Sequence, residues 1–196
     1  MGFDISGCNP TQQTPFPKVC TDLQDKYQEN EDDMFWLDKV TDLERSKYFF
    51  NHTKWQTENV GEYFRSQVWM WGTALDFIEF ACKQQGDFLT EEDFKGCSYN
   101  DYYYINEIKA KKMSDAIHKA IDNETLKSFY NEYAAYKKSE GYTHEDDCPK
   151  KTIKSPLGDV TAPADGYREF FSYDRIKNHI QNFANFANSS GGFTVG

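Results

Sequence analysis

No part of the sequence contains the run of about 18 apolar residues that a membrane-spanning helix needs. The first ten residues also lack the apolar stretch of a secretory signal, because Asp4 and Asn9 interrupt them. The five cysteines are odd in number and irregularly spaced, which argues against a disulfide scaffold or a zinc motif. We therefore expect a soluble, cytoplasmic protein that has no membrane partner and keeps most of its thiols reduced.

Basic side chains are in the minority. Lysine and arginine number 22 against 32 aspartates and glutamates, which gives a formal net charge of −10. Because phosphate backbones attract proteins of the opposite charge, direct nucleic-acid binding is not expected. A negative surface can instead meet a basic protein partner, or it can serve solubility alone.

Sequence motifs of familiar chemistry are absent too. There is no P-loop and no GxGxxG, HExxH or GxSxG sequence, so no cofactor and no catalytic residue is predicted. These absences do not exclude an enzyme, since catalytic groups need only meet in space. His144 and Cys148 would supply two metal ligands at most, so no metal site is predicted.

Aromatic residues, by contrast, make up 17% of the 196-residue chain, and bulky rings suit a core built from short elements. They are dense in the stretch 61–81. Its larger apolar residues step by four and three, which predicts one buried face of a helix over about 62–84: Phe64, Val68, Trp71, Leu75, Ile78 and Cys82. We expect Trp71 to be almost fully buried.

The rest of the chain predicts further helices and two terminal strands. Helices are expected over about 107–122, from Asn123 to Gly141, and from Ser172 onward, with a short turn opened by Thr90. Residues 3–5 and 193–195 alternate as strands do and are expected to pair. The predicted fold is a single, mainly α domain over 1–196. It is a helical domain around the central aromatic-rich helix, with a minor β-sheet from the chain termini. Residues 11–58 are read as a subsidiary helical insertion and 142–170 as a long surface loop.

Four stretches resemble an uncharacterised family of small bacterial and phage proteins. They are MGFDISGCNP at 1–10, GEYFRSQVWMW at 61–71, SYND at 98–101 and FANFANSSGGF at 183–193. The resemblance covers residues 1–10, about 61–122 and about 172–195. It implies a phage, prophage or mobile-element neighbourhood and no particular activity. The chain departs from the family at Ser66 and Gln67, where relatives usually have two asparagines.

Arg65 is the first candidate binding residue, because a guanidinium on an apolar helix needs an acceptor. Glu62, one turn before it, and Asp101 are the expected partners. Arg65 would then be either a clamp for an anionic ligand or part of a structural ion pair stacked on Trp69.

The polar and aromatic loop that contains Tyr99, Asn100 and Asp101 is the second candidate. Such a loop is suited to binding. It is equally suited to a turn in which Asn100 and Asp101 bond their own backbone.

Two functional hypotheses follow. The first is a non-enzymatic protein whose acidic surface binds a basic host protein, in its sharpest form inhibiting a nucleic-acid-handling or defence factor. It expects at least two of the acidic runs 29–33, 91–93 and 145–147 on one exposed face. The alternative is a small-ligand or nucleotide-binding protein, or an enzyme, with a site around Arg65 and residues 99–101.

Overall fold

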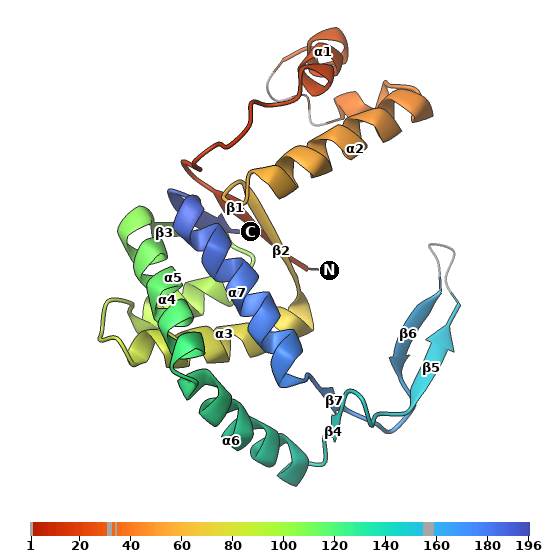
Figure 1. Cartoon of the computed structure of the whole chain (residues 1–196). Helices are drawn as coiled ribbons and strands as arrows, with labels where there is room; N and C mark the ends of the chain where they lie inside the picture. The colour runs from red at the N-terminus through yellow and green to blue at the C-terminus, as the bar shows by residue number, and fades with distance from the viewer. Residues whose placement is uncertain (1, 31–32, 34, 155–158) are drawn as a thin grey trace.

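The computed structural model describes residues 2–30, 33, 35–154 and 159–196. Helices predominate, and a small antiparallel sheet accompanies them, as the sequence predicts (Figure 1). The helices are α1 (Lys18–Tyr27), η1 (Trp36–Asp38), α2 (Asp42–Glu58), α3 (Val68–Lys83), α4 (Glu91–Cys97), α5 (Glu107–Asp122), α6 (Thr125–Ser139) and α7 (Tyr173–Ser189).

The main sheet has four strands in the order β2-β1-β8-β3, and every neighbouring pair is antiparallel. They are β2 (Tyr63–Gln67), β1 (Gly2–Gly7), β8 (Gly192–Val195) and β3 (Tyr103–Asn106). The predicted pairing of the two ends of the chain is therefore confirmed, with Ile5 opposite Val195. Phe3 and Phe193 both face the core, because alternate strand residues point to one face of a sheet.

The core lies between this sheet and the helices α3, α5 and α7. Trp71 is only 1% exposed, which confirms its predicted burial, and its indole Nε1 donates a hydrogen bond of 2.8 Å to the Cys97 carbonyl. The helix starts predicted at Asn106 and Ser172 are also found. The Asn106 side chain accepts from the Lys109 amide at the start of α5, and the Ser172 side chain accepts from the Arg175 amide at the start of α7.

The central helix begins later than predicted. Residues 63–67 form the edge strand β2, and α3 starts only at Val68. Phe64 and Ser66 point inward, while Arg65 between them is exposed. The alternation of inward and outward residues that marks a strand was not recognised in the sequence, because the apolar residues of the same stretch also fit the spacing of a helix. Pairing with β1 decided the outcome, because β1 needs a partner on that side to satisfy its backbone groups.

Residues 11–58 contain α1, η1 and α2, which pack around a second, smaller hydrophobic cluster that includes Trp36 and Tyr48. Figure 1 shows this part projecting from the body of the molecule beside β1 and β2. The Trp55 indole, which donates to the Thr14 carbonyl at 3.0 Å, and Asn59, which bonds to Thr14 and to the Gln13 amide, connect the end of α2 to the chain that follows β1.

The segment 142–170, predicted as a long surface loop, contains short strands among its described residues. It contains the parallel pair β4 (Thr143–His144) with β7 (Glu169–Phe170) and a hairpin of β5 (Lys150–Ile153) with β6 (Val160–Pro163). The hairpin projects away from the helices (Figure 1). β4 and β7 have only two residues each, which is too short for an alternation that a sequence pattern can reveal.

Candidate functional site

A polar groove of about 590 Å³ lies between β2 and α7, beside the first turn of α3. Its lining consists of two arginines, three side-chain amides, a histidine and a methionine: Arg65, Arg175, Gln67, Asn178, Asn182, His179 and Met70. Arg175, Asn178 and Asn182 follow one another at helical spacing on α7, so they share one side of that helix. The edge strand β2 and the helix α7 thus both place polar side chains in the wall of this groove.

The charge of this lining is opposite to that of the whole protein. The net charge is −10, yet no carboxylate lines the groove among the described residues. Each of the four other described cavities has at least two acidic side chains in its wall. A groove of this size matches the volume of small-molecule sites, which range from about 300 to 1,000 Å³.

Arg65 is held by a neighbour on the next strand. It lies opposite Asp4 in the β1–β2 register, and its Nε is 3.6 Å from the Asp4 carboxylate. Asp4 also accepts a hydrogen bond from the Tyr63 hydroxyl. The partner predicted for Arg65, Glu62 or Asp101, is therefore wrong, because the strand register decides which carboxylate it meets. The Arg65 side chain is still 66% exposed, so most of its donors face solvent.

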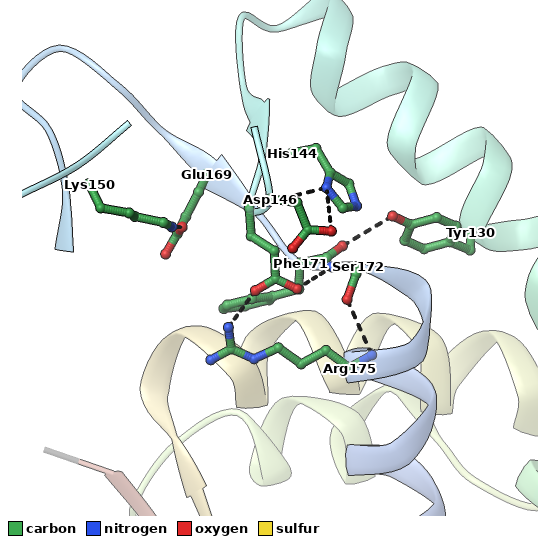
Figure 2. A network of polar contacts seen from close by, with 9 residues as sticks. Tyr130, His144, Asp146, Lys150, Glu169, Phe171, Ser172 and Arg175 are labelled. Atoms are coloured by element: carbon green, nitrogen blue, oxygen red, sulfur yellow. Dashed lines mark hydrogen bonds and ion pairs between the residues drawn. The ribbon is translucent and has the colours of Figure 1, made fainter. Parts of the chain in front are cut away.

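Arg175 is fixed more firmly, at the start of α7. Its guanidinium pairs with the Glu145 carboxylate and lies 4.6 Å from the centre of the Phe171 ring. The same carboxylate accepts from the Ser172 amide at 2.7 Å, and the Tyr130 hydroxyl donates to the Phe171 carbonyl at 3.2 Å. Figure 2 shows this network around the start of α7. It holds the Arg175 side chain in one orientation and leaves part of its guanidinium available to a ligand.

His179 lines the groove and contacts the buried Ser66. The Nε2 atom of His179 is 2.8 Å from the Ser66 hydroxyl, and the Phe64 ring packs against the imidazole. Burial, together with the charge of Arg175, lowers the pKa of His179 from 6.5 to about 4. The imidazole is therefore neutral at neutral pH and serves as a hydrogen-bonding group rather than as a third positive charge.

The other residues predicted to form a site do not join this groove. Trp69 is 80% exposed and, with Arg65 on a strand, the predicted stacking of the two within one helix is wrong. Glu62 accepts a hydrogen bond from Gln12. Tyr99 and Asp101 are exposed in the loop before β3, at the opposite edge of the sheet from β2, and Asn100 donates to the Gly2 carbonyl at 3.0 Å.

Sequence reasoning missed six groove residues, which are Gln67, Met70 and the four on α7: Arg175, Asn178, His179 and Asn182. The signal for those on α7 was present as a polar stripe at i, i+3 and i+7 beside the apolar face of that helix. A polar stripe normally marks a solvated face, and only the proximity of β2 turns this one into a wall of a groove.

The acidic runs have internal partners. Asp93 is buried and pairs with Lys109, and Glu145 pairs with Arg175. In the first run, Glu29 and Asp33 both contact Lys39, and residues 31 and 32 lie outside the described residues. The three runs lie in different parts of the fold, near α1, at α4 and after β4 (Figure 1). The structure therefore gives the acidic-surface hypothesis less support than the groove.

A pH dependence of stability should follow from the burial of His179. The pKa is about 4 in the folded chain against 6.5 for a free imidazole, so between these values the unfolded chain binds more protons. Stability should be fully present above pH 6.5 and decline as the pH falls toward 4, by roughly 2–3 kcal/mol from this residue. Urea unfolding at pH 7 and pH 4.5 should show the decline, and His179→Gln should reduce it.

The control for this measurement is His118→Gln on α5, which should retain the wild-type decline. His52 contributes in the same direction, because burial lowers its pKa as well. Some loss of stability at low pH therefore remains in every variant, and the test is the difference in that loss between His179→Gln and His118→Gln. An equal pH dependence in wild type and His179→Gln would contradict the buried, neutral state of His179.

Comparisons with protein-family models, with curated proteins and with solved structures found no match. Membership of the phage and bacterial family thus stays a prediction. Within the described part of the chain, no helix combines the length and apolar character needed to cross a membrane. No three metal-ligating side chains come together among those same residues.

Proposed function

We propose that this protein binds a small anionic ligand, one that carries a phosphate or a carboxylate, in the groove between β2 and α7. One observation carries the proposal: two arginines and three amides line a groove without a carboxylate in an otherwise acidic protein. A guanidinium binds planar anions through two parallel hydrogen bonds, and amide groups select the oxygen positions around them.

Each arginine is positioned but not saturated. Asp4 meets Arg65 at 3.6 Å, which is longer than a hydrogen bond, and Glu145 engages one terminal nitrogen of Arg175. The remaining donors can bind a ligand while these carboxylates hold the arginines in place. Such preorganisation favours affinity, because the side chains lose little freedom when the ligand arrives.

Binding, rather than catalysis, is the activity that this geometry supports. Ser66 and His179 are in hydrogen-bonding distance, as in a nucleophile and its base. However, Ser66 is buried, and no described carboxylate orients the other ring nitrogen of His179. The contact therefore supports the wall of the groove, and we assign no reaction to it.

The test uses the full chain and three separate probes: inorganic phosphate, citrate and AMP. The sequence has four arginines, so the Nε–Hε resonances of Arg65 and Arg175 can be followed by NMR with Arg45 and Arg168 as internal references. At least one probe should shift the two groove resonances in a saturable way, with a dissociation constant of about 1 mM or lower. Higher salt should weaken binding by screening.

The matched variants are Arg65→Gln in the groove and Arg168→Gln outside it. Removing one charged donor should weaken binding about tenfold, which corresponds to roughly 1.4 kcal/mol, while the Arg168 variant should bind as the wild type does. The proposal is wrong if no probe saturates, or if the two variants weaken binding equally.

A further inference from the structure

A second groove, of about 500 Å³, lies on a different part of the surface, between α3 and α6. Its lining is aromatic and acidic. The rings are Phe80, Phe129, Tyr133 and Tyr136, and the carboxylates are Asp76, Glu79 and Glu132. Phe80 and Phe129 are stacked with ring centres 4.2 Å apart and nearly parallel, so each ring covers one face of the other and the pair forms an apolar stack at the floor of the groove. Tyr136 is 60% exposed at the rim.

The carboxylates of this groove are only partly matched by cations of the chain itself. Lys83 pairs with Glu79, and Lys137 lies 5.4 Å from the centre of the Tyr133 ring. Lys83 is itself a lining residue of the groove, whereas Lys137 contacts its wall from beside it. Asp76 and Glu132 make no hydrogen bond or ion pair among the described residues. The groove therefore has two carboxylates without a hydrogen-bonded or ion-paired cation beside its aromatic floor, and Lys137 attracts one of them, Asp76, only at longer range.

We propose that this groove docks a basic segment of a partner protein, with an arginine or lysine side chain placed over the aromatic floor and paired with Asp76 and Glu132. Charge complementarity selects this occupant, because an apolar segment would leave both carboxylates unpaired and an acidic one would be repelled. The aromatic faces add a cation–π attraction, which the contact of Lys137 with Tyr133 already shows within the chain.

The geometry also suits a helical segment. The wall residues Asp76, Phe80 and Lys83 recur at three- and four-residue spacing on α3, and Phe129, Glu132 and Tyr136 do so on α6. A groove between two helices accepts an amphipathic helix that places apolar residues on the floor and basic ones at the carboxylates. This docking groove is separate from the anion groove of β2 and α7 and does not depend on it.

The experiment measures fluorescence anisotropy of a labelled 14-residue amphipathic peptide of leucine and arginine with the full chain. The test variant is Asp76→Asn with Glu132→Gln. The control is Glu91→Gln with Glu92→Gln, which makes the same change in net charge at exposed positions on α4. We expect the test variant to weaken binding about tenfold and the control less than about threefold, because screened long-range charge contributes little.

A second pair of variants tests the aromatic part. Tyr136→Ala should weaken peptide binding by about three- to tenfold, whereas Tyr104→Ala, equally exposed on β3, should not. Both tyrosines are on the surface, so neither change should prevent folding. Equal weakening in the paired variants, or no peptide binding at all, would overturn the proposal.

Two other results would also overturn it. Saturable binding of choline without binding of the peptide would assign the groove to a small cation. A dimer in sedimentation experiments that Tyr136→Ala dissociates would assign it to a second copy of the chain.

Discussion

Trp71→Ala is expected to lower the free energy of unfolding by roughly 3–5 kcal/mol. The indole is almost fully buried and touches the rings of Phe3, Phe64 and Phe183. Its removal leaves a large cavity where sheet and helices meet. It also leaves the Cys97 carbonyl without the indole donor, and an unsatisfied buried acceptor adds to the loss. Urea unfolding at pH 7, followed by circular dichroism, measures the effect.

The control is Trp69→Ala, two residues earlier in the chain. Trp69 is exposed at the start of α3, so its removal should change stability by less than about 0.5 kcal/mol. Trp71→Phe should fall between the two, because it keeps most of the ring volume and loses the hydrogen bond. Similar losses for both alanine variants would mean that Trp71 is not the centre of the core.

Asp93→Ala is expected to lower stability by roughly 2–4 kcal/mol. The Asp93 carboxylate is only 3% exposed. It accepts two bonds of 2.8 Å from Lys109, and it completes the capping box at the start of α4 by accepting from the amide and the hydroxyl of Thr90. Without it, α4 keeps the cap from the Thr90 hydroxyl but loses the reciprocal half of the capping box. Lys109 on α5 also loses its counter-charge on α4, and with it the ion pair that connects the two helices. Urea unfolding at pH 7 again gives the difference.

The matched control is Glu92→Ala, the preceding residue of the same acidic run. Its side chain is exposed and makes no hydrogen bond or ion pair among the described residues, so the change should stay within about 0.5 kcal/mol. Equal losses at positions 92 and 93 would contradict the structural role of Asp93. Such a result would again make the acidic run 91–93 a candidate for the surface that binds a basic partner.

The effect of Asp93 should also depend on pH in a definite direction. Burial alone would raise the pKa of Asp93, but the bonds from Lys109 and Thr90 outweigh it and hold the pKa below its usual 3.8. The stabilisation is therefore fully present above pH 3.8 and is lost as the pH falls through the lowered value. Asp93→Asn should match the wild type more closely in strong acid than at pH 7.

The sequence alone determined the features that depend on local pattern. The starts of α5 and α7 follow from Asn106 and Ser172, because a capping side chain bonds to an amide three residues away. The burial of Trp71 follows from apolar spacing. The pairing of the two ends followed from their matching alternation, because a short strand is stable only when it is paired within a sheet.

Only the tertiary structure decided where β2 ends and α3 begins, and which charged side chains form ion pairs. The stretch 63–67 fits either period, and β1 made it a strand by pairing with it. The register of that pairing places Arg65 opposite Asp4, so Arg65 forms its ion pair with Asp4 instead of Glu62 or Asp101. The groove was equally out of reach of sequence analysis, since its walls come from residues 65–70 and 175–182, about a hundred positions apart. Contacts between such distant segments depend on how sheet and helices pack, and no local pattern records that packing.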